Sequence, residues 1–198
     1  HLPVHLYTDG KPSCDNEYGV SQKLEHFLDN RLIPFHRKYI KDVLQELDLN
    51  SCDELAKRSF YLSLSDQYWV CPFNQKDKLK WEDINFFSNE YDSALGLRLV
   101  DNSGSLNKNS ASHSPDNATP GELPKRWIRI GNKKYLATAG TGNEQQEPLN
   151  EVLASEICRR LGFSYVPYTF KERNNQYFCI CLDMVAEDSE LVPMDSVY

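Results

Sequence analysis

The side chains best suited to bind an anion gather in the stretch from Lys125 to Lys134. Five cations stand there with no acidic residue among them: Lys125, Arg126, Arg129, Lys133 and Lys134. Such a cluster attracts phosphate groups, but lysine and arginine also mark the solvated edge of a β-hairpin, where they discourage pairing with another chain. The residue types support both interpretations.

Two neighbouring features could take part in the same chemistry. Glu151 lies at the start of a predicted helix, where a carboxylate interacts favourably with the helix dipole. The loop Gly140-Thr141-Gly142 is rich in glycine, yet it matches no phosphate-binding motif. We interpret that loop as a flexible connection.

Metal and nucleophile chemistry has little support in the sequence. His26, His36 and His113 form no cluster and are not expected to bind a metal. The six cysteines match neither the spacing of a zinc site nor that of a dense disulfide scaffold, so reduced thiols are expected. Cys179 and Cys181 stand two apart in an apolar run, which on a strand places both on one buried face. No segment resembles a catalytic triad or a pair of catalytic carboxylates.

The composition is that of a globular protein. The 198 residues are 40% hydrophobic and 26% charged, enough to bury a core. A formal net charge of −7 argues against a general nucleic-acid binder, which needs a concentrated basic surface. With neither an apolar run of about 18 residues nor a signal-peptide layout at the start, we expect a soluble, cytoplasmic protein without a membrane segment.

Residues 21 to about 60 are predicted to form a small helical unit. A first helix is expected from a cap at Ser21 to a stop at Pro34. The next helix is indicated by an apolar stripe at helical spacing: Ile40, Val43, Leu44 and Leu47. Ser51 and Glu54 then form a capping box that begins a third helix.

The middle of the chain differs in composition. From Asp101 to Pro124 it is rich in Ser, Asn, Gly and Pro and has few apolar residues. We therefore predict that residues 101–118 form a flexible linker or loop. It separates a largely helical subdomain, residues 1–100, from a second unit at residues 119–198.

The second unit is predicted to have the order β-β-α-β-β. Strands at 126–130 and 135–138 are joined through Gly131-Asn132, and a second hairpin pairs residues 165–170 with 176–182. Between the hairpins, a helix begins at Pro148 and ends at Gly162, and its apolar face contains Leu149, Val152, Leu153, Ile157 and Leu161. The predicted fold class is α+β, a small helical unit followed by an antiparallel sheet with one packed helix.

Three segments carry a resemblance to a known family. Residues 150–167, which begin Asn-Glu and close with Leu-Gly and Val-Pro, resemble the helix-to-strand signature of HipA-like serine/threonine kinases. Residues 64–69 and 81–87 resemble the amino-terminal half of the same family. The similarity covers residues 30–193 and implies a kinase N-lobe-like fold for residues 119–198, ending at the hinge.

The resemblance implies a nucleotide-binding set of seven residues. They are Thr119 and Gly121 in the phosphate-side loop, Thr138 on a strand, Glu151 on the helix, and Leu182, Asp183 and Val185 at the hinge. A loop serine in the family can be self-phosphorylated, and Thr119 is the nearest hydroxyl here. The family's helix glutamate holds a strand lysine that touches the α- and β-phosphates.

The sequence departs from the family at that lysine. Thr138 stands in its place and carries no charge to neutralise phosphate. Lys133 and Lys134 are the substitutes considered from sequence alone. Without a lysine partner, the interpretation of Glu151 as an ordinary first-turn acid is preferred.

The resemblance also implies what this chain leaves to another segment. The family's catalytic-base Asp and its metal-binding Asn and Asp lie in the carboxy-terminal lobe, so we expect no phosphotransfer by these residues alone. ATP and Mg²⁺ are expected only with that lobe present. Implied partners are the missing or separate kinase C-lobe and a cognate antitoxin. The alternative is a stand-alone protein from a phage or mobile element that uses the N-lobe scaffold to bind or inhibit a macromolecular partner.

Overall fold

The protein is a mixture of helices and one main antiparallel sheet. The computed structural model describes residues 7–8, 11–12, 17–107 and 113–192. The helices are α1 (Glu17–Asp29), α2 (Ile40–Leu47), α3 (Cys52–Arg58), α4 (Trp81–Ile84), α5 (Ala94–Asp101) and α6 (Glu147–Leu161), with 3-10 turns η2 (Phe73–Gln75) and η4 (Pro115–Asn117). The strands are β1 (Tyr7–Thr8), β2 (Lys11–Pro12), β3 (Lys125–Ile130), β4 (Lys133–Ala139), β5 (Tyr168–Arg173) and β6 (Gln176–Leu182). Among the described residues, no helix combines the length and apolarity that crossing a membrane requires.

Within the helical unit, α2 and α3 form where the sequence predicts them, whereas α1 begins earlier than predicted. The four stripe residues of α2 are all buried, and they pack with Leu55 of α3 and with Leu95 and Leu99 of α5. The prediction for α1 was wrong at its start: the helix already includes Glu17, so Ser21 lies inside it rather than at its cap. A serine is compatible with both positions, and only the backbone decides between them.

The predicted cap of α3 is confirmed. Ser51 Oγ accepts a hydrogen bond from the backbone N–H of Glu54 at 3.1 Å. The Glu54 carboxylate accepts from the backbone N–H of Asn50 at 2.8 Å, one residue before the position that a standard capping box uses. Both contacts fix the point at which the chain enters the helix.

Replacing Ser51 with alanine is expected to lower the free energy of unfolding by about 1 kcal/mol, because the Glu54 N–H loses its acceptor. Ser93 provides a matched control, since it is the N-cap of α5 but its side chain makes no capping hydrogen bond. Ser93→Ala should change stability by less than about 0.5 kcal/mol. Urea denaturation of both variants measures the difference, and equal losses would contradict the assignment of the cap.

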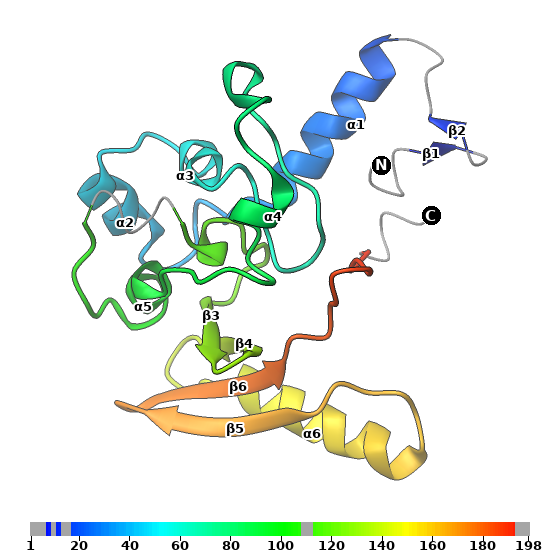
Figure 1. Ribbon diagram of the computed structural model, residues 1–198. Coiled ribbons are helices and arrows are strands. Elements are labelled where there is room, and N and C mark those ends of the chain that lie inside the picture. The colour runs from blue at the N-terminus through cyan, green and yellow to red at the C-terminus, as the bar shows by residue number, and fades with distance from the viewer. Residues whose placement is uncertain (1–6, 9–10, 13–16, 108–112, 193–198) are drawn as a thin grey trace.

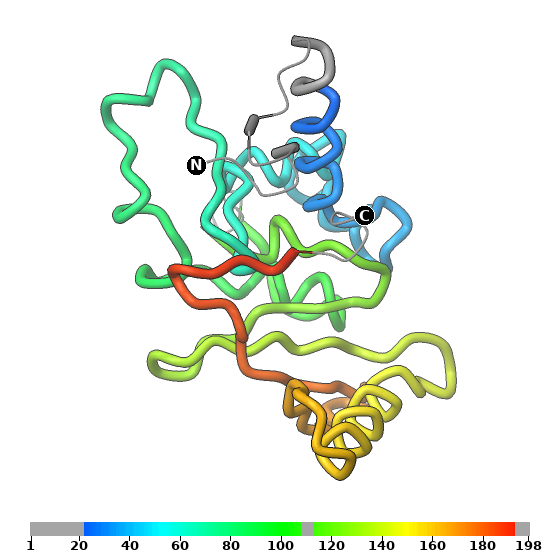
Figure 2. The backbone as a smooth tube through the Cα atoms, turned by 90° about the vertical axis from the view of Figure 1, so that its right-hand side faces the viewer, coloured from blue at the N-terminus to red at the C-terminus, as the bar shows by residue number. Residues whose placement is uncertain are grey.

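The four-stranded sheet has the order β3-β4-β6-β5, and every neighbouring pair is antiparallel. The predicted β-β-α-β-β order is confirmed, with β5 beginning at Tyr168. Each hairpin turns where its sequence allows a left-handed backbone, at Gly131 in the first (φ 58°) and at Asn174 and Asn175 in the second (φ 53° and 59°). The sheet lies between the helical unit and α6 (Figures 1 and 2).

The two faces of the sheet have different partners. Val100 of α5 packs against Ala137, Ala139 and Phe178 on one face. The register places Lys125, Trp127, Leu136, Thr138, Cys179 and Cys181 on the other face. Cys179 and Cys181 are buried there as free thiols, and Cys14 lies outside the described residues.

The apolar face predicted for the helix after Pro148 does not pack as an apolar face. Leu149, Leu153, Ile157 and Leu161 are 47–63% exposed. The buried positions of α6 are Pro148 and Ser155, and the Ser155 hydroxyl donates to the carbonyl of Val166 at 2.9 Å. The helix therefore contacts β5 and β6 along a narrow line beside its aliphatic row.

Part of the segment that was predicted to be a flexible linker is buried in the structure. Ser114, Asp116, Asn117 and Ala118 are at most 1% exposed, although their composition suggested a mobile segment. Asp116 explains the difference, because its carboxylate accepts from the backbone N–H of Trp127 at 2.7 Å and so ties the segment to β3. Polar side chains can be buried when backbone groups satisfy them. Residues 108–112 of the predicted linker lie outside the described residues.

Candidate functional site

The site begins with a cavity on the face of the sheet opposite α5. Its volume is about 170 Å³, and its walls are largely apolar. The lining residues are Ser63–Ser65, Ala118–Pro120, Lys125, Trp127, Leu136, Cys181–Val185 and Leu191. That volume is smaller than the pockets of drug-sized ligands, so the cavity can enclose a ring the size of a base and leaves larger groups outside.

The segment after β6 forms one wall. The N–H of Asp183 donates to the carbonyl of Lys134 at 2.8 Å, and Oδ1 of Asp183 accepts from the N–H of Val185 at 3.0 Å. Burial raises the pKa of the Asp183 carboxyl group. The chain then runs back to the helical unit (Figure 2), where Leu191 N–H donates to the carbonyl of Ser65 at 2.8 Å. This wall is thus fixed at both ends.

Two buried polar atoms belonging to lining residues lack a hydrogen-bond partner within the described part of the chain. One is the donor Nε1 of Trp127, and the other is the acceptor Oδ2 of Asp183. A buried donor or acceptor without a partner costs about 1–3 kcal/mol. Both atoms are also closed off from solvent, so a ligand in the cavity would bond to them only after a local shift of the wall.

The loop at Thr119–Gly121 borders the cavity and is held by one arginine. Arg37 donates to the hydroxyl of Thr119 at 3.0 Å and, through Nε, to the carbonyl of Gly121 at 3.0 Å. Its Nη2 also donates to the carbonyls of both residues. Burial lowers the pKa of Arg37 to about 10, which leaves it charged at neutral pH.

The predicted phosphorylation position is enclosed in this conformation. Thr119 is 3% exposed, and its hydroxyl donates to the carbonyl of Asp116 while accepting from Arg37. A phosphate donor therefore cannot reach the hydroxyl unless the loop first leaves Arg37. Whether Thr119 is modified stays a prediction.

The remaining predicted residues lie beside the cavity rather than around it. Thr138 is on β4, directly opposite Lys125 of β3 in the register. Glu151 is exposed in the first half of α6, on the same side of the sheet, and interacts electrostatically with Lys125. The structure therefore gathers Thr119, Leu182, Asp183 and Val185 at the cavity and sets Gly121, Thr138 and Glu151 outside its lining.

Sequence reasoning missed three contributors to the site. Trp127 and Leu136 were assigned only to strands, yet the face alternation of β3 and β4 could have placed them together. Arg37 lies between α1 and α2, and 82 residues separate it from Thr119 in the loop that it holds. No local pattern relates such distant positions.

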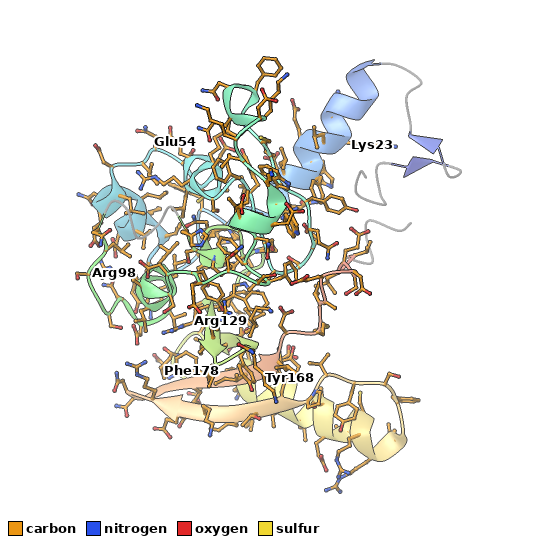
Figure 3. The ribbon with its side chains drawn as sticks, in the orientation of Figure 1. Lys23, Glu54, Arg98, Arg129, Tyr168 and Phe178 are labelled. Atoms are coloured by element: carbon orange, nitrogen blue, oxygen red, sulfur yellow. The ribbon has the colours of Figure 1, made fainter. Side chains whose placement is uncertain are left out.

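The sheet and the helical unit also meet away from the cavity. Arg129 lies between them (Figure 3), and its Nη1 donates to the carbonyl of Asn89 at 2.5 Å. Lys134 Nζ donates to the carbonyl of Phe87 at 3.2 Å. Two cations of the basic stretch are thus used to join the two parts of the protein.

Comparisons with family models, with curated proteins and with solved structures find no match to this chain. Among the described residues, no group of three or more His, Cys, Asp or Glu side chains is arranged to hold a metal ion.

Proposed function

We propose that this chain is the nucleotide-facing, non-catalytic portion of a HipA-like serine/threonine kinase, with an N-lobe-like sheet and helix. The observation that carries the proposal is the cavity at the end of β6. Four residues that the resemblance assigns to a nucleotide site lie in its lining. They come from two segments of the chain that are more than 60 residues apart.

The chemistry of the cavity suits an adenine ring. Leu64, Leu136 and Val185 offer apolar walls to the faces of the base. After a local shift of the wall, the unsatisfied acceptor of Asp183 and donor of Trp127 would match the amino group and ring nitrogens of a purine. The phosphates would then extend toward the loop at Thr119–Gly121, and the acids that hold Mg²⁺ would come from a catalytic lobe.

Adenosine is expected to bind the protein with a dissociation constant on the order of 0.1–1 mM, without any turnover of ATP. Titration followed by NMR should shift the amide signals of Leu136, Cys181 and Val185. The weak affinity is expected because this lobe alone encloses only the base.

Filling the cavity provides the test of the site. Val185→Trp should abolish the adenosine-induced shifts, whereas Val70→Trp, at a 40% exposed position outside the cavity, should leave them unchanged. Thermal melts of both variants check that each is folded. If wild-type protein shows no shift up to the solubility limit of adenosine, or if ATP is hydrolysed by this chain alone, the proposal is wrong.

A further inference from the structure

The position that lacks its lysine has a lysine next to it on the neighbouring strand. Lys125 and Thr138 are directly opposite each other in the antiparallel pairing of β3 and β4. Residues so paired point to the same face of the sheet, with Cβ atoms about 4.5–5.5 Å apart. A long side chain at position 125 can therefore reach the region that a long side chain at position 138 would reach.

The Lys125 side chain reaches the predicted phosphate-side loop. It lines the cavity, and its Nζ lies 2.9 Å from the point where a Cβ of residue 121 would be. Gly121 has a φ of 91° and no Cβ, so the ammonium group can approach the loop backbone. Glycine at 121 thus provides both the turn and the space for this cation.

The Lys125 ammonium group has no hydrogen bond or ion pair to any residue in the described ranges, although it is half-buried. Arg37 repels it, and Glu151 attracts it through space without an ion pair within 4 Å. A partly buried charge without a partner is unfavourable, and an anion placed there would be stabilised.

Three other cations of the region, Lys133, Lys134 and Arg37, lie outside the cavity lining. Lys134 contacts the carbonyl and ring of Phe87, and Lys133 is exposed at the hairpin turn, paired with Ile130. Arg37 donates to the carbonyls of Thr119 and Gly121 and to the Thr119 hydroxyl. Lys133 and Lys134 are thus both absent from the lining of the cavity.

We propose that Lys125 is the cation that contacts the α- and β-phosphates of an adenine nucleotide in this protein, replacing from β3 the lysine that the resemblance would put at position 138 on β4. The proposal rests on the proposed function, because it concerns the phosphate end of the same site. Glu151 then orients Lys125 from α6.

The protonation of Lys125 gives the contact a pH dependence. Burial, with the nearby Arg37 guanidinium, lowers the pKa of Lys125 to about 8, and the Glu151 carboxylate opposes this shift. The pKa of the Cys179 thiol is raised to about 11, so it stays neutral in this range. Lysine is charged below its pKa, so the preference for a nucleotide over a nucleoside should fall as the pH rises through about 8.

The test compares ADP with adenosine, both titrated against the 198-residue protein at pH 7. Wild-type protein is expected to bind ADP at least about tenfold more tightly than adenosine. Lys125→Met should bring the ratio of the adenosine and ADP dissociation constants to about one, and Lys133→Met, which lies outside the cavity lining, should leave that ratio at its wild-type value. Lys125→Met combined with Thr138→Lys should restore the preference, since the cation returns from the opposite strand.

The outcomes separate the two proposals. If Lys125→Met retains the preference for ADP, Lys125 is not the phosphate contact, although the site for the base stands. If wild-type protein binds both ligands equally, the phosphate contact is likewise refuted. If neither ligand binds wild-type protein, the proposed function fails, and the role of Lys125 fails with it.

Discussion

Asp116→Ala is expected to lower the free energy of unfolding by about 3–5 kcal/mol. The side chain is fully buried, and its carboxylate accepts from the N–H of Trp127 at 2.7 Å and from the hydroxyl of Ser114 at 3.4 Å. The substitution leaves the Trp127 N–H without an acceptor and removes a carboxylate that interacts electrostatically with Arg126 and Arg37. Urea denaturation measures this loss directly if the slope of the unfolding free energy against urea concentration is the same in the variant and in wild type.

The same carboxyl group should make stability depend on pH. Burial raises the pKa of Asp116 to about 7, although the Trp127 N–H and Arg126 oppose the shift. Because the folded-state pKa lies above the unfolded value of about 4, the folded protein binds the proton more tightly. The stabilisation linked to protonation of Asp116 is therefore greatest below pH 4 and is lost as the pH rises through 7, whereas the hydrogen bond from the Trp127 N–H can form in both protonation states.

Asp116→Asn is the matched variant for this dependence. Its amide oxygen can accept from Trp127 as the carboxylate does, but the side chain does not titrate. The difference in stability between wild type and Asp116→Asn should change by several kcal/mol between pH 4 and pH 7. Parallel stability profiles over that range would show that Asp116 does not titrate with a raised pKa.

Arg37→Ala is expected to cost about 3–5 kcal/mol and to release the loop at Thr119–Gly121. The guanidinium group holds two carbonyls and one hydroxyl of that loop, and it is the main link between the loop and the segment before α2. Hydrogen exchange of the loop amides should become faster in the variant. Amides of α2, whose buried stripe does not depend on Arg37, should retain their relative protection.

Arg37→Lys distinguishes shape from charge at this position. Lysine keeps the positive charge, but a single ammonium group cannot reproduce the planar set of donors that reaches both Thr119 and Gly121. We expect a loss of stability close to that of the alanine variant. Full stability of Arg37→Lys would mean that charge alone holds the loop.

The parts of the fold that the sequence predicted well depend on residues close together in the chain. The stripe of α2 repeats every three or four residues, and the turn at Gly131 follows from one residue that accepts a positive φ. The Ser51 cap joins positions three apart. Such features are fixed by local geometry, so a single sequence is enough to predict them.

The missed parts depend on contacts between distant positions. Asp116 was assigned to a linker because its segment is polar, and nothing local indicated that the backbone of β3 would satisfy its carboxylate. The relation of Lys125 to Thr138 requires the strand register, and the strand predicted at 126–130 began one residue too late to include Lys125. The composition of a segment indicates how much apolar surface it can bury. It does not indicate which of its polar groups will form hydrogen bonds with distant residues.

The aliphatic row on α6 has a consequence for how this sequence tolerates change. Leu149, Leu153, Ile157 and Leu161 fill no cavity in this chain, so their truncation removes few buried contacts. Glutamate, lysine or glutamine at these positions would keep the helix propensity within about 0.5 kcal/mol. If folding were the only constraint, substitutions at these four positions would therefore be tolerated as well as substitutions in a surface loop. The spacing of the four residues nevertheless resembles that of a buried helix face.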